Sequence, residues 1–311
     1  MPARYAYRHV APLTAFVVVT TVAIAGCGAP EPETPPPPEP QTPTIEQVRG
    51  ATIKGVYDDP VTLKDGVYEG PPFVEGGASR PRVQLIGDLV AFGNLDGATG
   101  DEAAAMLSES SGGSGERIYV TVIGMRDGVP TSLGTVEVGD RTKIRTFGIS
   151  GADVVMEVVE AGPGEPMCCP TQLARKVYGF ENGTLTIKNS EVTGTLSIAL
   201  LAGPEWTVVE IDDTPLPDGA KPPTATFEGE RVAGFGGCNR YTGAIKETAP
   251  GQVQIGPLAG TMMACPEPAS QVEGGFLMSF GKATQYTFLA GRLHVSGMDG
   301  ETFRSVLFVR P

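Results

Sequence analysis

The sequence predicts a mainly β protein with some α structure, folded as two small β-rich domains of which the C-terminal one is α+β. Gly and Pro are abundant, at 42 and 28 of the 311 residues, so the chain turns often. Between the turns lie short alternating apolar runs that are rich in β-branched residues, and such runs indicate strands. The length also favours two domains over one.

The first 26 residues are typical of a secretory signal peptide. Arg4 and Arg8 precede an apolar run over residues 10–25, and small residues end it, as at a cleavage site. The run is shorter than the roughly 20 residues that a membrane-spanning helix needs. Cys27 comes next and completes the sequence Ile-Ala-Gly-Cys.

This tetrapeptide resembles the lipobox of bacterial lipoproteins. The resemblance implies that Cys27 becomes the mature N-terminus and carries acyl chains such as palmitate. Because each buried CH₂ contributes about 0.8 kcal/mol, several chains anchor a protein firmly. The expected partner is therefore a membrane and the expected location is the cell envelope, at the outer membrane facing the periplasm if the source is Gram-negative. The alternative is a plain signal peptide with a chance cysteine.

Residues 27–44 are predicted to form the lipidated N-terminus and a stiff spacer. Pro and Glu dominate this stretch, and proline fixes φ and removes backbone donors, so we expect an extended chain. At about 3.1 Å per residue, the spacer would hold the folded part of the protein away from the membrane.

The chain that remains after residue 26 is acidic and poor in histidine. Loss of Arg4 and Arg8 changes the formal net charge from −13 to −15, and a charge of this sign repels nucleic acid. His294 is then the only histidine, so a Ser-His-Asp or Cys-His relay would depend on it alone, and a His-rich zinc site is excluded. We therefore expect no enzyme, no nucleic acid partner and no cofactor, with calcium the one exception considered below.

Residues 45–201 are predicted to form the first β-rich domain. Asp-Gly or Asn-Gly dipeptides at residues 65–66, 127–128 and 182–183 supply the positive φ that tight hairpins need. The sequence Ala-Ala-Ala-Met-Leu at residues 103–107 is compatible with a helical turn, but its context favours a strand. The other expected strands lie at residues 51–57, 82–92, 116–125, 132–138, 143–150, 153–160, 172–181 and 184–188.

One loop of this domain carries oxygen donors around a glycine turn. Asn94, Asp96, Asp101 and Glu102 lie at positions suited to a Ca²⁺ loop, and the stretch resembles the loops of FG-GAP-like and related lipoprotein domains. Two charged donors of that pattern are missing, because Asn94 replaces the first acid and Ala98 the third ligand. The loop is therefore interpreted either as a low-affinity calcium site or as a loop that has kept its turn and lost the ion. The order of GNLDG, SSGGSG and MCCPTQ along the domain is similar to an uncharacterised domain of bacterial lipoproteins, which implies no function.

Residues 202–311 are predicted to form the second domain, with its boundary near Gly203-Pro204. Strands are expected at residues 226–232 and 253–255, with a glycine turn, Phe-Gly-Gly-Cys-Asn, after the first of them. An amphipathic helix is expected next, and its apolar face consists of Val272, Phe276, Phe280 and Ala283.

The second domain resembles the META domain of the HslJ-like heat-shock proteins. The resemblance rests on the order and spacing of GGCNRYTG, TMMAC, a Glu and Phe on the helix, and a closing apolar pattern at Leu293, Val295 and Phe303. Gly260 departs from the paired threonines that are more frequent in the family. The resemblance implies a sheet with one helix, in an envelope domain without established catalytic residues. The motif residues are Trp206, Gly237, Cys238, Asn239, Tyr241, Gly243, Thr261, Cys265 and Glu273.

The Gly-Gly-Cys-Asn segment of this motif permits two interpretations. Two glycines let the backbone bend sharply, and Asn239 can cap neighbouring backbone groups. The segment is either one wall of a ligand cleft or a purely structural turn, and we favour the structural turn.

Four cysteines remain besides Cys27, and they allow three pairings. Cys238 and Cys265 both lie in the META motifs, so an oxidising compartment favours a disulfide between them, worth about 3 kcal/mol. Cys168 and Cys169 are adjacent and would bridge only with a distorted peptide between them. The alternative to structural disulfides is a Cu(I) site with sulfur ligands from two loops: Met167, Cys168, Cys169, Met262, Met263 and Cys265.

Three functional classes compete on these observations. We favour a non-catalytic, lipid-anchored envelope protein that acts by binding, in stress response or envelope maintenance, through its META-like domain. A metal-handling lipoprotein for Cu or Ca is the alternative. An envelope hydrolase lacks a credible pair of nucleophile and base. The sequence names neither the ligand nor a protein partner.

Overall fold

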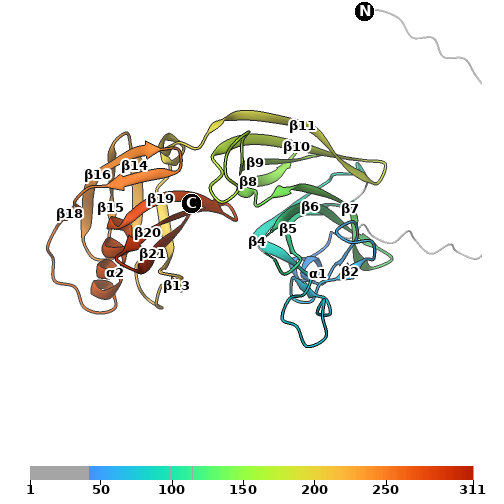
Figure 1. Ribbon diagram of the computed structural model, residues 1–311, viewed down its shortest axis with the longest axis horizontal. Helices are drawn as coiled ribbons and strands as arrows, with labels where there is room; N and C mark the ends of the chain where they lie inside the picture. The colour runs from blue at the N-terminus through green and yellow to red at the C-terminus, as the bar shows by residue number, and fades with distance from the viewer. Residues whose placement is uncertain (1–41, 99, 114, 311) are drawn as a thin grey trace, which may run out of the picture. The chain divides into compact units, whose positions relative to one another are not determined.

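The computed structural model describes residues 42–98, 100–113 and 115–310 (Figure 1). The predicted signal peptide, the predicted lipid-bearing Cys27 and the spacer up to residue 41 lie outside these ranges. The described chain is mainly β with little helix, as the sequence predicts. Within it, no helix combines the length and the apolar character that crossing a bilayer requires.

The first part of the described chain forms two sheets. Its elements are α1 (Ile45–Arg49), β1 (Thr52–Ile53), β2 (Val61–Thr62), β3 (Val67–Glu69), β4 (Arg82–Gly93), β5 (Glu102–Ser110), β6 (Arg117–Arg126), β7 (Val129–Asp140), β8 (Lys143–Ser150), β9 (Asp153–Glu160), β10 (Gln172–Glu181) and β11 (Thr184–Thr195). One sheet has the order β2-β1-β7-β6-β5-β4-β3 and the other β11-β10-β9-β8. Neighbouring strands are antiparallel except β1 and β7.

Strand β5 is buried on both of its faces. Ala104 and Met106 belong to an apolar cluster that also contains Met156 and Tyr178 of the four-stranded sheet. Leu107 points the other way and packs in a second cluster with residues of α1 and β1. Because neither face meets water, the strand shows no polar alternation. The alanine-rich run is therefore a strand, which confirms the favoured alternative.

The C-terminal part folds as one sheet that closes on itself. Its elements are the 3₁₀ turn η1 (Ile198–Leu201), β12 (Trp206–Ile211), β13 (Thr214–Pro215), β14 (Thr224–Glu228), β15 (Arg231–Phe235), β16 (Arg240–Ala249), β17 (Gln252–Ile255), β18 (Ala259–Gly260), α2 (Ala269–Gly281), β19 (Ala283–Leu289), β20 (Arg292–Asp299) and β21 (Thr302–Val309). The order is β13-β12-β14-β15-β16-β17-β19-β20-β21, and β12 also pairs with β21, with Thr207 opposite Val309.

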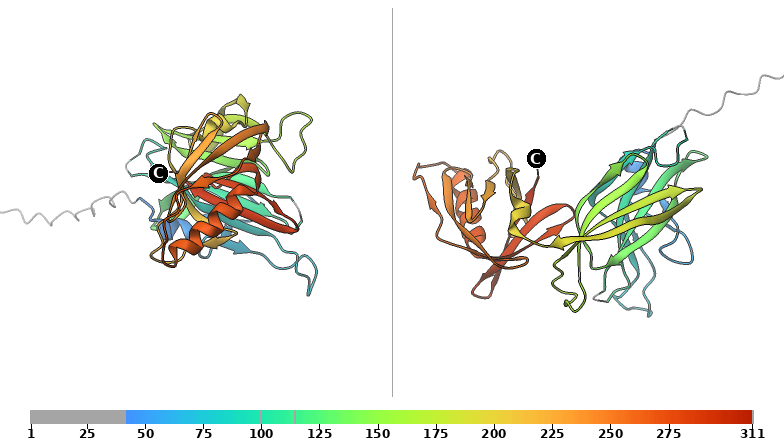
Figure 2. Two further views of the ribbon diagram at one scale, coloured as in Figure 1. Left: turned by 90° about the vertical axis from the view of Figure 1, so that its left-hand side faces the viewer. Right: turned by 90° about the horizontal axis from the view of Figure 1, so that it is seen from above.

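Helix α2 lies against this sheet (Figure 2). Its aromatic side chains pack in the interior of the sheet. The rings of Phe276 and Phe280 stack with centroids 5.3 Å apart, and both also meet the ring of Phe308 edge-on. Tyr241 contacts Phe276 at 5.4 Å, and Trp206 is fully buried in the same cluster. The sequence prediction of a sheet with one helix is confirmed, and this helix is placed by its apolar face.

The strand predicted at residues 226–232 is a hairpin instead. β14 ends at Glu228, Gly229 adopts a φ of 58°, and β15 begins at Arg231. The apolar alternation continues across the turn because Phe227 and Val232 bury their side chains in the same cluster. A continuous alternation therefore concealed the reversal of the chain.

The helix ends earlier than its predicted apolar face. Gly281 is its last residue, and Ala283 is the first residue of β19. Ala283 nevertheless packs in the same cluster as Phe276, so the spacing fitted a helix that had already ended. In the first part, the strand predicted at residues 51–57 is reduced to β1, because the chain leaves the sheet after Ile53.

The described residues from 42 to 310 belong to one compact unit. The apolar cluster around Trp206 includes Val159 and Leu173, which belong to β9 and β10. The N–H of Gly291 also donates a hydrogen bond to the carbonyl of Ile144 (2.9 Å). Residues before and after the domain boundary predicted from the sequence therefore contact each other, through apolar side chains and through a backbone hydrogen bond.

Candidate functional site

The glycine turn of the C-terminal sheet is held by the disulfide that the sequence predicts. The turn joins β15 to β16, and within it Gly237 has a φ of 115°, where a side chain would be strained. Cys238 follows the turn and is bonded to Cys265, with 6.1 Å between their Cα atoms. This distance lies within the usual disulfide range of roughly 4.4–6.8 Å. The predicted Cys238–Cys265 bridge is confirmed.

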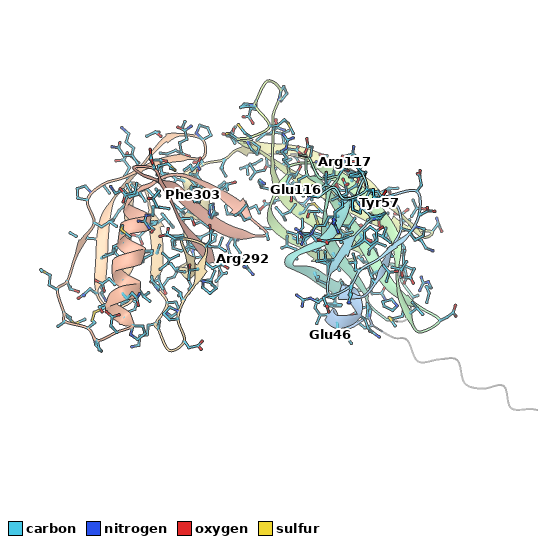
Figure 3. All side chains as sticks on the ribbon, turned by 60° about the horizontal axis from the view of Figure 1, so that its bottom comes forward. Glu46, Tyr57, Glu116, Arg117, Arg292 and Phe303 are labelled. Atoms are coloured by element: carbon cyan, nitrogen blue, oxygen red, sulfur yellow. A yellow bond between two sulfur atoms is a disulfide. The ribbon has the colours of Figure 1, made fainter. Side chains whose placement is uncertain are left out.

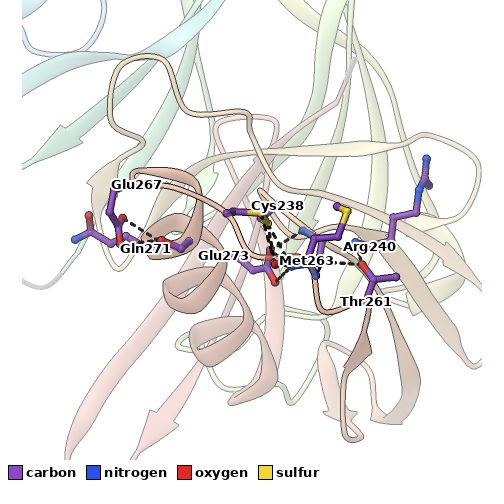
Figure 4. The surroundings of a disulfide bond; sticks show 10 residues. Cys238, Arg240, Thr261, Met263, Glu267, Gln271 and Glu273 are labelled. Carbon is purple, nitrogen blue, oxygen red and sulfur yellow. Dashed lines mark hydrogen bonds between the residues drawn. A yellow bond between two sulfur atoms is a disulfide. The ribbon is translucent and has the colours of Figure 1, made fainter.

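The side chain of Asn239 links the turn to the loop after β18 that carries the second cysteine. Figure 4 shows Thr261, Met263 and Glu273 near Cys238. Its Oδ1 accepts hydrogen bonds from the Thr261 hydroxyl and the Met263 N–H, both at 2.8 Å. Its Nδ2 donates to the Met263 carbonyl at 3.2 Å. The side chain is buried, and only an amide can both donate and accept in this arrangement. Asn239 therefore holds residues 261–263 in place, through the Thr261 hydroxyl and the backbone of Met263.

Glu273 connects the same turn to helix α2. Its Oε2 accepts the Asn239 N–H at 2.6 Å, and its Oε1 accepts from Asn239 Nδ2 at 3.2 Å. A Cβ on Gly236 would lie 3.1 Å from Glu273 Cγ, so a small residue suits that position. The disulfide, Asn239 and Glu273 thus hold the turn, the loop at residues 261–265 and helix α2 together. The polar atoms of Asn239 and Glu273 are hydrogen-bonded within this cluster. This favours the structural interpretation of the turn.

The remaining META motif residues also have structural contacts. Trp206 Nε1 donates to the Leu201 carbonyl at 2.9 Å, and the Tyr241 hydroxyl donates to the Thr224 carbonyl at 2.9 Å. Burial raises the pKa of Tyr241, which keeps the phenol neutral. A Cβ on Gly243 would lie 2.6 Å from the Leu258 side chain. The motif therefore describes how this sheet is packed.

An open cleft of about 450 Å³ lies beside the glycine turn. Arg231 and Arg240 line it from β15 and β16, and Ala233, Gly260 and Thr261 are among its small wall residues. Neither arginine has an acidic partner among the described residues, and both side chains are exposed. Arg231 Nε donates only to the Thr242 hydroxyl, at 3.1 Å. Sequence reasoning missed this cleft, although Arg240 lies inside the quoted motif.

Three of the four proposed calcium ligands accept hydrogen bonds within their own loop. Asn94 Oδ1 accepts the Gly97 N–H and Asp96 Oδ1 accepts the Ala98 N–H, each at 2.8 Å. Glu102 is buried, and its Oε2 accepts the Leu95 N–H at 2.9 Å. Their oxygens therefore close the turn.

The carboxylates of this loop are not gathered into a cluster. Asp96 faces Arg126 at 4.0 Å, and the Asp101 N–H donates to Thr42. In the part of the chain that the structure describes, no three His, Cys, Asp or Glu side chains form a group suited to a metal. Calcium binding at this loop stays a prediction for titration to decide.

Cys168 and Cys169 are exposed free thiols whose Sγ atoms lie 2.7 Å apart. The structure therefore does not place them in a disulfide. Cys265 is bonded to Cys238, so it cannot serve as a thiolate ligand. The Cu(I) site drawn from two loops loses one of its sulfur ligands for this reason.

His294 is partly buried on β20. Its ring stacks on that of Phe303 of β21, with centroids 6.4 Å apart. Phe303 is labelled in Figure 3. Burial lowers its pKa below the ordinary value, although Asp213 and Glu210 act in the opposite sense. His294, Cys168 and Cys169 line one cleft of about 580 Å³. This is the place where a Cys-His relay would have to lie.

In comparison with known proteins, similarity to a family model is found in the C-terminal part of the chain. The NMR structure of a protein from Burkholderia xenovorans is 26% identical to this chain, covering 36% of this chain and 85% of that one, with a TM-score of 0.29. No curated protein matches the chain. Residues 199–308 match the family model of the META domain, in agreement with the motifs of the sequence.

Proposed function

We propose that the protein is a non-catalytic, lipid-anchored protein of the cell envelope that binds an anionic group through its META domain. The observation that carries the binding proposal is the arginine cleft. Arg231 and Arg240 line this cleft from opposite ends of the paired strands β15 and β16, on a chain whose net charge is −13. Neither one forms an ion pair with an acid of the described chain.

The chemistry of the cleft favours carboxylate or phosphate. Guanidinium groups present planar donors that match the oxygens of either anion. The Thr242 hydroxyl donates to the Val232 carbonyl, and the Thr261 hydroxyl donates to Asn239. The two arginines therefore supply the donors, and small residues between them leave room for the anion.

The envelope location is supported by two independent observations. A structural disulfide, Cys238–Cys265, persists in oxidising compartments outside the cytosol. The Ile-Ala-Gly-Cys sequence at Cys27 supplies the lipid anchor in this proposal. The META domain at residues 199–308 suggests a stress-related or envelope-associated role, and such a role requires no chemistry at the site.

The binding proposal is tested with inorganic phosphate and with two kinds of vesicle. NMR titration of the protein from residue 42 onward with phosphate should shift amide signals around the cleft. Sedimentation with phosphatidylglycerol vesicles, compared with phosphatidylcholine vesicles, distinguishes a lipid headgroup from a free anion. The double variant Arg231→Ala/Arg240→Ala should weaken binding about tenfold, or about 1.4 kcal/mol.

The matched control removes two other exposed arginines. The variant Arg80→Ala/Arg175→Ala changes the net charge equally but leaves the cleft intact. An equal loss of binding in both double variants would mean that general charge attracts the anion and would overturn the cleft proposal. Raised salt should weaken binding in each case because exposed charges are screened.

Anchoring is tested separately by labelling with palmitate in bacterial cells. The wild-type chain should incorporate the label, and Cys27→Ser should not, because no thiol remains at that position to accept a diacylglyceryl group. The variant Cys168→Ser/Cys169→Ser is the control and should keep the label. Label on the Cys27→Ser protein would refute the anchor.

A metal-handling role is the second candidate, and one observation favours it. Cys168 and Cys169 present two soft donors at the surface, next to Met167. Metal analysis of the purified protein with and without added Cu(I), for the wild type and for Cys168→Ser/Cys169→Ser, decides it. Equal copper content in the two proteins would exclude this pair as the site.

A further inference from the structure

The adjacent thiols of Cys168 and Cys169 have no structural task in the described chain. Both side chains are exposed, and the hydrogen-bond partner of each sulfur is the other one. The disulfide of the C-terminal sheet uses the other two cysteines. Free exposed thiols are uncommon in proteins of oxidising compartments unless they react. The pair therefore calls for a chemical explanation.

The loop that carries the thiols is held at its base by one carboxylate. Glu165 Oε2 accepts the N–H groups of Gly162 and Thr171, each at 3.0 Å. The Thr171 hydroxyl donates to the other carboxylate oxygen, and this bond above all lowers the pKa of Glu165. The two ends of the loop are thus fastened together, so the thiols are presented by a preorganised segment.

A local turn brings the two sulfurs together. The Cys169 N–H donates to the Pro166 carbonyl at 3.1 Å, which bends the chain around the pair. The Sγ atoms lie 2.7 Å apart, against about 2.05 Å in a disulfide. To form the bond, the sulfurs move together and the peptide between the two cysteines distorts to close the ring, while Glu165 continues to hold the ends of the loop.

We propose that Cys168 and Cys169 form a thiol–disulfide exchange site that cycles between a dithiol and a vicinal disulfide. The oxidant is a disulfide, either a small molecule or a cysteine pair of another envelope protein. One protein thiolate attacks it, forms a mixed disulfide and expels one thiolate. The second protein sulfur then attacks the mixed disulfide and expels the other. The net change is one protein dithiol oxidised and one disulfide reduced to two thiols, which take up the two protein protons.

Either sulfur can attack and the other can resolve, because both thiols are exposed and lie next to each other. Contact with the Cys168 thiol raises the pKa of Cys169. The vicinal bond closes a small ring around one peptide and is exposed, and strained or exposed disulfides are more easily reduced than structural ones. Cys238–Cys265 should therefore stay oxidised while this pair cycles.

The test uses purified protein from residue 42 onward in glutathione buffers of graded redox ratio. Peptide mass spectrometry should show the peptide with both cysteines losing two hydrogen atoms as the buffer becomes oxidising, without added glutathione. Cys168→Ser and Cys169→Ser should each stop at a mixed disulfide of the remaining cysteine, because no resolving thiol remains. The Cys238–Cys265 peptide should be unchanged throughout and serves as the internal control.

A positioning role for Glu165 is tested in the same buffers. Glu165→Gln should shift the redox midpoint of the pair, because one oxygen of the clamp is replaced by a donor, while fluorescence of Trp206 should confirm an intact fold. The proposal is wrong if both thiols stay reduced in excess oxidised glutathione. It is also wrong if only mixed disulfides or linked dimers accumulate in the wild type. Neither result depends on where the protein is located or on the arginine cleft.

Discussion

Removal of the Cys238–Cys265 bond should lower the free energy of unfolding by about 3.5 kcal/mol. The two cysteines are 27 residues apart in the sequence. The chain-entropy relation for a loop of that length gives a denatured-state entropy loss of about 12 cal/mol/K, which is about 3.5 kcal/mol at 25 °C. For a chain of this size, a loss of 1 kcal/mol lowers Tm by about 2–4 °C. The expected fall in Tm is therefore about 7–14 °C.

The double variant Cys238→Ala/Cys265→Ala should still fold. Asn239 continues to hold residues 261–263 through three hydrogen bonds, and Glu273 continues to hold the turn against α2. The native contacts on both sides of the bond thus remain, and the main change is the freedom gained by the unfolded chain.

Urea unfolding followed by tryptophan fluorescence measures this change. Trp206 is the only tryptophan of the chain and is fully buried in the core of the C-terminal sheet, so its emission reports the part that carries the disulfide. The control variant Cys168→Ala/Cys169→Ala should stay within about 0.5 kcal/mol of the wild type, as exposed sites usually do. A loss below about 1 kcal/mol in the disulfide variant would refute the entropy argument and show that the hydrogen bonds alone close the loop.

Three further predictions concern polar contacts. Asn239→Asp should lower the free energy of unfolding in urea by about 2–3 kcal/mol, because it leaves the Met263 carbonyl without its donor and places a second carboxylate next to Glu273. An unchanged free energy of unfolding would show that Asn239 does not hold the turn in place. Burial acts to raise the pKa of Asp212, but the Ser305 N–H and Arg304 outweigh it, so the pKa is lowered; this stabilisation is complete above about pH 3.9 and is lost as the pH falls through the folded-state pKa. Asp212→Asn should abolish that part of the acid dependence, and an unchanged profile would contradict it. Calorimetry with millimolar Ca²⁺ should detect no heat of binding, because oxygens of the loop at residues 94–102 already accept backbone N–H groups. A saturable heat of binding would contradict this prediction.

Local patterns predicted the elements that lie in regular hairpins. The bounds of β8, β9 and β10 agree with the sequence prediction to the residue, because their polar and apolar sides alternate and glycine turns end them. The hairpin at Gly229 was missed since alternation continues through it. No strand was predicted after the glycine turn, yet residues 240–249 form β16. There the glycines mark only the entrance to a strand.

The candidate sites were harder to predict because their members are far apart in the sequence. Cysteine pairing could be predicted from two motifs, and Asn239 was correctly singled out as a cap. Its partners Thr261 and Glu273 were named as motif residues, but their contacts depend on where β18 and α2 pack, which no periodicity states. The arginine cleft depends on the pairing of β15 with β16, so Arg231 carried no signal of its own.

The pairing of β12 with β21 sets the order in which the C-terminal sheet can be assembled. β12 is the first long strand of this sheet and β21 is the last, and Thr207 meets Val309 across the join. Contacts so distant in sequence form slowly because a long loop must close first. During synthesis every other strand can exist before the final residues emerge, but the ring cannot be completed. The C-terminal sheet therefore stays open until its last strand is available, and its apolar interior is closed off from water only once residues 302–309 have been made.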